Sequence, residues 1–142
     1  MTIPTLYTDL YTVFQSQIQD SIFNTSIVRD DLSKQYLINS ITKFRRCLQD
    51  LNDRDDILET FNIELIEDEK QILGNLMVIE YLSSQIISIE LVKQTMTSKD
   101  FSMTSQSAHL DKLLLLRDSR KKEISKMIVD YTYNFSDLKK LK

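Results

Sequence analysis

Two side chains capable of nucleophilic or acid–base chemistry each occur once in the sequence: the thiol of Cys47 and the imidazole of His109. A cysteine and a histidine can act together when the imidazole takes up the thiol proton. These two lie far apart in the chain, and no tight glycine-bearing turn beside either would build an oxyanion hole. We therefore expect structural roles for both residues and no catalytic residue.

Other cofactor chemistry is equally poorly supported by the residue types. The only glycine is Gly74, so a glycine-rich loop that binds phosphate is excluded. The acidic stretch "NDRDD" at 52–56 lacks the glycine turn of a calcium-binding EF-hand loop. A single histidine rules out a His-pair metal site. We expect no metal, no cofactor and no enzymatic activity.

The composition predicts an all-α protein. One glycine and one proline in 142 residues fall far below the usual combined share of roughly 12%, and strands joined by tight turns depend on both residues. This length suits one domain with its own core. Cys47 has no partner for an intrachain disulfide, which favours a reducing compartment.

Apolar residues recur at spacings of three to four in four segments, 4–24, 31–51, 67–96 and 110–131, which predicts a helical bundle of about four helices. We expect residues 1–130 to form this bundle and residues 131–142 to form an extended tail. Asp30 or Asp31 is a candidate cap for the second helix, and Cys47 falls beside its apolar stripe.

Two of the three segments that link these predicted helices have patterns of their own. Residues 57–65 are ambiguous between a helical turn and an extended segment, but Phe61, Ile63 and Leu65 alternate with polar residues, which favours a strand-like or irregular connector. Residues 97–110, "TSKDFSMTSQSAHL", read as a joint between the third and fourth helices, with Phe101 and Met103 expected to pack on the bundle. Within the third helix, Gly74 costs about 1 kcal/mol relative to alanine, so we expect a close helix contact there.

The charges are unevenly distributed. Residues 48–70 carry nine acids and two bases, whereas residues 110–142 carry nine bases and five acids. The two segments can simply be solvated faces. Alternatively, the acidic part of one molecule meets the basic part of a neighbour in a head-to-tail assembly.

Membrane and nucleic-acid partners are disfavoured. No stretch approaches 18 uncharged apolar residues, and residues 1–10 lack the pattern of a secretory signal, so we expect neither a membrane span nor a leader. The fourth predicted helix has a basic face suited to phosphate contacts. The acidic total and the lack of a helix-turn-helix signature count against nucleic-acid binding, which would show as retention on DNA that falls steeply with salt.

Four phrases carry a resemblance to a known class of protein: "SITKFRRCLQDLNDRDD" at 40–56, "ILGNLMVIEYLSSQI" at 72–86, "MTSKDFSMTSQSAHL" at 96–110 and "MIVDYTYN" at 127–134. Together they resemble the small helical neck proteins of tailed bacteriophages, in particular the head-to-tail adaptors, or head completion proteins, that dock under the portal. The similarity spans most of the chain and includes no catalytic motif.

The resemblance implies a structural protein of the virion neck, made in the host cytoplasm. Its implied partners are the portal protein, a stopper or tail-completion protein, and copies of itself in a dodecameric ring that extends the DNA channel without binding DNA specifically. It also implies a C-terminal segment that anchors the ring in the portal. The residues of that segment expected to bind the partner are Tyr131, Tyr133, Phe135, Leu138, Lys139, Lys140 and Lys142. The alternative is an intracellular helical regulator that acts through protein–protein contacts.

Overall fold

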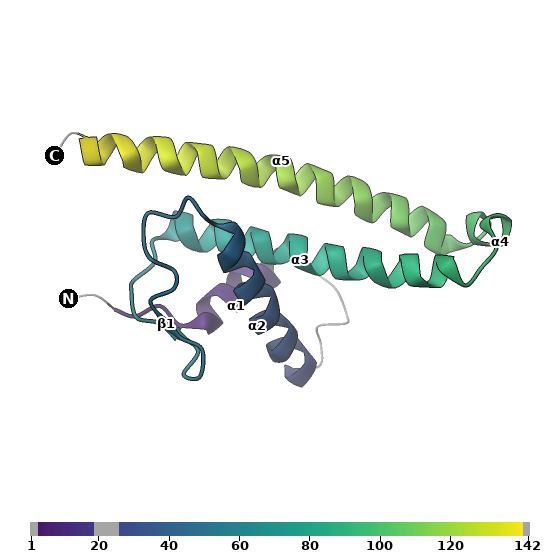
Figure 1. Ribbon diagram of the computed structural model, residues 1–142, viewed down its shortest axis with the longest axis horizontal. Helices are drawn as coiled ribbons and strands as arrows, with labels where there is room; N and C mark the ends of the chain where they lie inside the picture. Colours follow the sequence, from purple (N-terminus) through teal and green to yellow (C-terminus); the bar gives the residue numbers. More distant parts are fainter. Residues whose placement is uncertain (1–2, 19–25, 141–142) are drawn as a thin grey trace.

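The computed structural model describes residues 3–18 and 26–140, with side chains at 3–18 and 31–135. Among these residues it is almost entirely helical (Figure 1). The elements in chain order are α1 (Tyr7–Ser16), α2 (Ser26–Lys43), β1 (Arg54–Asp55), β2 (Thr60–Phe61), α3 (Glu67–Gln94), α4 (Ser98–Ser102) and α5 (Ser105–Lys140).

Helix α3 is the central element. Helices α1 and α2 pack on one side of its N-terminal half, and α5 runs antiparallel along another side (Figure 1). The short helix α4 makes the joint at one end, whereas the β1–β2 hairpin, the 44–53 loop and the C-terminal part of α5 lie at the other. This arrangement confirms the predicted all-α, single-domain fold of roughly four helices.

The sequence of α3 suits its central position. Every residue from 72 to 79 is buried, because this mostly apolar part of α3 contacts α1, α2 and α5. By length and composition α3 is also apolar enough to cross a membrane, and it is the only such helix in the described residues. However, 67% of its most apolar window is buried inside the bundle, and a core helix meets the same criteria.

Several boundaries differ from the sequence-based expectations. Helix α1 begins at Tyr7 and ends at Ser16, and the remainder of the first predicted helix, from residue 19, lies outside the described residues. Helix α2 ends at Lys43 instead of running to residue 51. The 57–65 connector contributes β2 to a two-stranded antiparallel hairpin. In the joint, Phe101 is buried as expected, but Met103 is exposed.

The expected extended tail is not seen in the described part of the chain. Helix α5 continues through residues 131–140 without a break. The sequence pattern weakens there because the helix needs only one apolar position per turn to stay on α3 and the 44–49 loop. Tyr131 and Phe135, four residues apart, supply those positions.

Gly74 confirms the expected close helix contact. A Cβ atom built at this position would collide with Cγ1 of Val13 in α1 and lie 3.1 Å from Val13 Cβ. Valine is stiff at χ1 in a helix, so its methyl group cannot simply rotate away. The glycine therefore sets the distance between α1 and α3.

We predict that Gly74→Ala lowers the free energy of unfolding by about 1 kcal/mol. Overpacking costs about 1–3 kcal/mol, and the better helix propensity of alanine returns about 1 kcal/mol of it. Chemical denaturation measures the change. In a Val13→Ala background the collision with Cγ1 is absent and only the 3.1 Å approach to the Cβ at position 13 remains, so the same substitution should destabilise the protein less. A stabilising effect in the wild-type background would contradict this account of the α1–α3 contact.

Candidate protein-interaction site

The predicted partner-binding residues divide into two groups on α5. Tyr131 is buried and Phe135 is half-buried against the core, with their ring centroids 5.3 Å apart. Tyr131 also packs edge-on against Phe44, at 5.5 Å between centroids. These two aromatic residues therefore fasten the C-terminal part of α5 to the bundle. Tyr131, although expected to bind the partner, is therefore not available on the surface.

A buried carboxylate explains the position of Tyr131. Glu69, in the first turn of α3, is only 1% exposed. Its Oε2 accepts hydrogen bonds from the Tyr131 hydroxyl at 2.7 Å and from the Cys47 thiol at 3.4 Å. Its Oε1 accepts from Gln49 Nε2 at 2.6 Å and from the Ile66 backbone N–H at 3.0 Å. The helix N-terminus further favours the negative charge at this position.

The Tyr131 hydroxyl also binds the loop that follows α2. It accepts a hydrogen bond from the backbone N–H of Leu48 at 2.9 Å. Burial is the main reason that the pKa of Tyr131 is raised, so the hydroxyl stays protonated and continues to donate to Glu69. The Glu69 cluster, formed by Glu69, Tyr131, Cys47, Gln49 and the backbone of Leu48, thus joins α3, α5 and the 44–49 loop.

The geometry gives no support to Cys–His chemistry. Burial raises the pKa of the Cys47 thiol to about 12, so the reactive thiolate is suppressed at neutral pH. His109 is exposed in the first turns of α5, next to the α4 joint and at the opposite end of the molecule from the 44–53 loop (Figure 1). Cys47 acts as a small, half-buried hydrogen-bonding residue.

We predict that Tyr131→Phe destabilises the protein by about 1–3 kcal/mol. The substitution keeps the ring but leaves a buried carboxylate oxygen and the Leu48 N–H short of a partner. Tyr133→Phe is the matched control, because that hydroxyl lies on an exposed side chain and its loss should cost less than about 0.5 kcal/mol. Denaturant titration of both variants measures the difference, and equal effects would contradict the role of the Glu69 cluster.

We also predict that Cys47 resists alkylation in the folded protein. With a pKa near 12 instead of the ordinary 9.0, its thiolate fraction at pH 8 falls by roughly two to three orders of magnitude, and the rate of iodoacetamide labelling falls with it. The urea-unfolded protein should react at the rate of a free thiol. Equal labelling rates in the two states would show that the thiol is neither buried nor bonded to Glu69.

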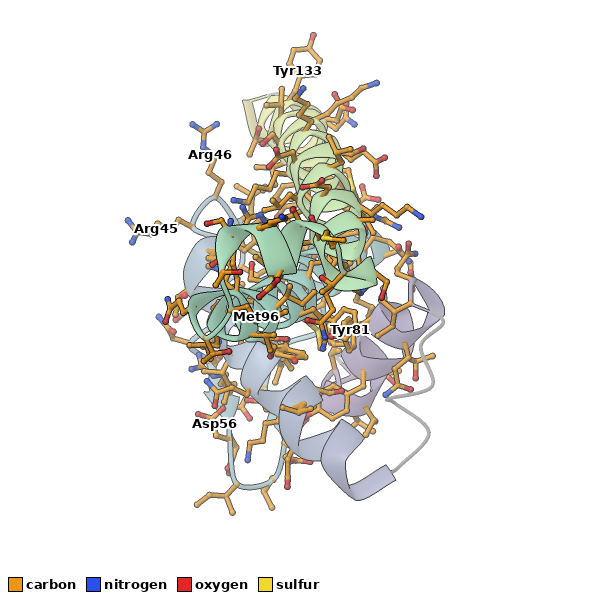
Figure 2. All side chains as sticks on the ribbon, turned by 90° about the vertical axis from the view of Figure 1, so that its right-hand side faces the viewer. Arg45, Arg46, Asp56, Tyr81, Met96 and Tyr133 are labelled. Carbon is orange, nitrogen blue, oxygen red and sulfur yellow. The ribbon has the colours of Figure 1, made fainter. Side chains whose placement is uncertain are left out.

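The second group of predicted residues includes the exposed part of α5. Tyr133 is 69% exposed and points away from the bundle (Figure 2). Leu138, Lys139 and Lys140 belong to the end of α5, but their side chains lie outside the described residues. Lys142 lies outside them entirely. Of the predicted set, the structure therefore places only Tyr133 on a described surface.

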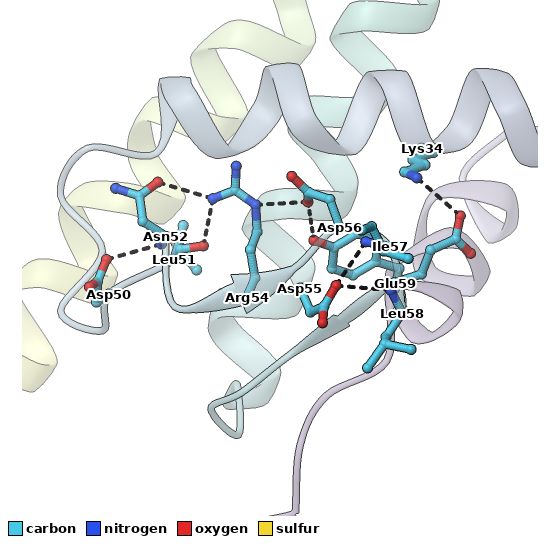
Figure 3. Close-up of polar contacts among 11 residues, drawn as sticks. Lys34, Asp50, Leu51, Asn52, Arg54, Asp55, Asp56, Ile57, Leu58 and Glu59 are labelled. Carbon is cyan, nitrogen blue, oxygen red and sulfur yellow. Dashed lines mark hydrogen bonds and ion pairs between the residues drawn. The ribbon is translucent and has the colours of Figure 1, made fainter.

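Two apolar side chains that sequence reasoning missed lie at the tip of the β1–β2 hairpin (Figure 3). Ile57 is 91% exposed and Leu58 is 72% exposed, which is unusual for adjacent large aliphatic residues. Four acids flank them in the sequence: Asp55, Asp56 and Glu59 beside the tip, and Asp53 at the other end of β1, where its carboxylate accepts from Asn62 Nδ2 at 2.9 Å. We call Ile57, Leu58 and these four acids the hairpin knob.

Hydrogen bonds hold the knob in one conformation. The Asp55 carboxylate accepts from the backbone N–H groups of Ile57 and Leu58, at 2.9 and 3.0 Å. Glu59 has a left-handed φ of 55°, and its carbonyl accepts from the Tyr7 N–H at 3.0 Å. This unfavourable backbone conformation persists only because the surrounding contacts fix it.

Asp56 links the knob to α1. Its Oδ1 accepts from the Tyr7 hydroxyl at 2.5 Å and from Arg54 Nε at 3.1 Å (Figure 3). The bond from Tyr7 is the main reason that the pKa of Asp56 is lowered. Tyr7 itself is buried against Phe61, at 5.1 Å between ring centroids. A well-packed base therefore presents Ile57 and Leu58 to solvent.

A groove with the opposite charge lies between the end of α2 and the outer side of α5. Its volume is about 360 Å³, and it is lined by Lys43, Arg45, Arg46, Ser125, Ile128 and Val129. Arg45 and Arg46 project away from the protein body (Figure 2), and neither has an ion pair with a described residue. Val129 is 55% exposed. We call this the basic groove.

The basic face of α5 is only partly available to an external partner. Arg120 turns inward, where its Nη1 donates to Asn75 Oδ1 at 3.0 Å and to Gln17 Oε1 at 3.2 Å. Arg117 is half-buried as well. Lys121, Lys122 and Lys126 remain exposed. The surface for phosphate contacts is therefore smaller than the sequence indicated.

Neither a metal site nor a matching protein adds to this description. Within the described ranges, no group of three or more His, Cys, Asp or Glu side chains could hold a metal ion. No family model, no curated protein and no solved structure matches the chain.

Proposed function

We propose that this chain is a structural protein that works by docking to other proteins, and specifically a head-to-tail connector adaptor of a tailed bacteriophage. In this role it forms a homo-oligomeric ring under the portal protein and extends the DNA channel. On its other side the ring contacts a stopper or tail-completion protein. It resides in the virion neck after synthesis in the host cytoplasm.

The observation that carries the proposal is the exposed Tyr133 on a firmly anchored part of α5. Tyr131 and Phe135 fix the helix on either side of it, so Tyr133 is presented at 69% exposure without freedom of the backbone. Tyrosine is one of the residues that most often dominate binding energy at interfaces. A rigidly presented aromatic side chain loses little entropy on binding.

The positions of the four segments that resemble phage neck proteins support the same proposal. The phrases at 40–56 and 127–134 meet at one end of the molecule, where the Leu48 N–H bonds to the Tyr131 hydroxyl. The phrase at 72–86 forms the buried part of α3, and the phrase at 96–110 forms the joint with α4. The segments that carry the resemblance therefore contribute Cys47, Leu48, Gln49 and Tyr131 to the Glu69 cluster, and they also contain the exposed Tyr133.

The direct test is the native mass of the chain mixed with the portal protein encoded in the same genome. We expect a ring-sized complex with the wild type and its loss with Tyr133→Asp, because a carboxylate would be buried at the portal contact. Deleting residues from 131 onward is not a clean test, since the deletion removes Tyr131 and with it the Glu69 cluster.

Leu115→Asp is the matched control for this experiment. Leu115 is 71% exposed on the same helix, at the part nearer α4, so it carries the same new charge at a similar exposure. Its complex with the portal should form normally. If the wild type stays free in the mixture, the connector role fails and the intracellular regulator becomes the better interpretation.

A further inference from the structure

The hairpin knob and the basic groove have complementary chemistry on one chain. The knob carries two exposed aliphatic side chains, Ile57 and Leu58, in a segment rich in acids. The groove has an aliphatic floor of Ile128 and Val129 and a rim of bases. Apolar surface opposite apolar surface, with acids opposite bases, is the pattern of a specific protein contact.

We propose that the hairpin knob of one molecule docks into the basic groove of a second copy of this chain. Ile57 and Leu58 cover Ile128 and Val129, while the acids around the knob approach Arg45 and Arg46. The two patches are different surfaces, so the contact is heterologous and can repeat from copy to copy into a ring or a filament.

Charge available for such a contact is present on both surfaces. Lys43 is already paired with Glu80, but Arg45 and Arg46 have no ion-pair partner among the described residues. On the knob, Arg54 pairs with Asp56 at 3.1 Å and Lys34 with Glu59 at 3.6 Å, which leaves Asp53 and Asp55 without a described basic partner. Both surfaces therefore carry charges of opposite sign that no described ion pair neutralises.

The same charges argue against a lipid surface as the occupant of the knob. An exposed Ile–Leu pair at a loop tip could insert into a bilayer, but membrane-binding loops gain affinity from bases that meet anionic headgroups. Here the flanking residues are acids. Anionic lipid would repel them, whereas the arginines of a second copy attract them.

The contact cannot form within one molecule. Figure 2 shows Arg45 and Arg46 projecting outward at one level of the protein and Asp56 at another, and neither arginine has an ion pair with an acid of the knob among the described residues. The base of the knob is fixed by Tyr7 and by β2, so the hairpin cannot swing across to the groove. Both surfaces consequently remain open for a neighbouring molecule.

This inference rests on the self-assembly that is one part of the proposed function, and it needs no portal. Sedimentation velocity over a concentration series of the full chain tests it. We expect the wild type to form larger species as the concentration rises. Leu58→Asp and Val129→Asp should each weaken self-association at least about tenfold, because each puts a carboxylate into an apolar contact.

Mixing the two variants gives the decisive result. A Leu58→Asp molecule keeps an intact groove and a Val129→Asp molecule keeps an intact knob, so the mixture should form a one-to-one dimer and no higher species. A two-fold contact through either patch alone would not show this complementation. Leu115→Asp, at a similarly exposed position outside both patches, should associate like the wild type.

Three outcomes would overturn the contact: a wild type that stays monomeric up to its solubility limit, variants that associate like the wild type, or a mixture that fails to dimerise. Both substituted side chains are exposed, so circular dichroism should show folded proteins in each case. If self-association follows this pattern but the portal is not bound, the connector role fails while the knob–groove contact stands.

Discussion

The hydrogen-bonded carboxylate of Glu69 is the constraint on which the rest of the structure depends. A buried charge is tolerable only when its oxygens are satisfied, and here the donors come from α5, from the loop after α2 and from the start of α3. Satisfying Glu69 therefore draws three segments together at one end of α3. With these hydrogen bonds in place, α2 ends at Lys43 and α5 lies along α3. Tyr133 is then on the outer side of α5.

The fold class could be predicted from the sequence, whereas the details at this end of the molecule could not. Scarce glycine and proline and the apolar spacing of three to four residues indicated the helices, and Gly74 indicated the close α1–α3 contact. The apolar stripe through Phe44, Leu48 and Leu51 predicted a longer α2, but tertiary hydrogen bonds to Leu48 and Gln49 outweigh local helix propensity. Nothing in the local pattern marks Glu69 as the one buried member of an acidic segment.

The candidate surfaces were only partly visible in the sequence. The acidic segment 48–70 and the basic segment 110–142 were evident from counting charged residues. The sequence did not show that Arg120 turns inward or that Arg45 and Arg46 turn outward. Ile57 and Leu58 lay in a segment that was predicted only as a strand-like or irregular connector. One signal was available: two adjacent aliphatic residues cannot both face inward from a strand, because successive side chains point to opposite faces. The resemblance to phage connectors drew attention to Tyr133, while the knob and groove emerge only in three dimensions.

The most direct test is side-chain footprinting with hydroxyl radicals, on the free chain and on the chain mixed with the proposed portal partner. It asks whether the protein works through the end of the molecule that carries the knob and groove. The account predicts that Ile57, Leu58, Val129 and Tyr133 lose reactivity in the assembled state, while Leu115 keeps it because it lies outside these surfaces. Unchanged reactivity at those four residues, or protection centred on Leu115 instead, would contradict the account.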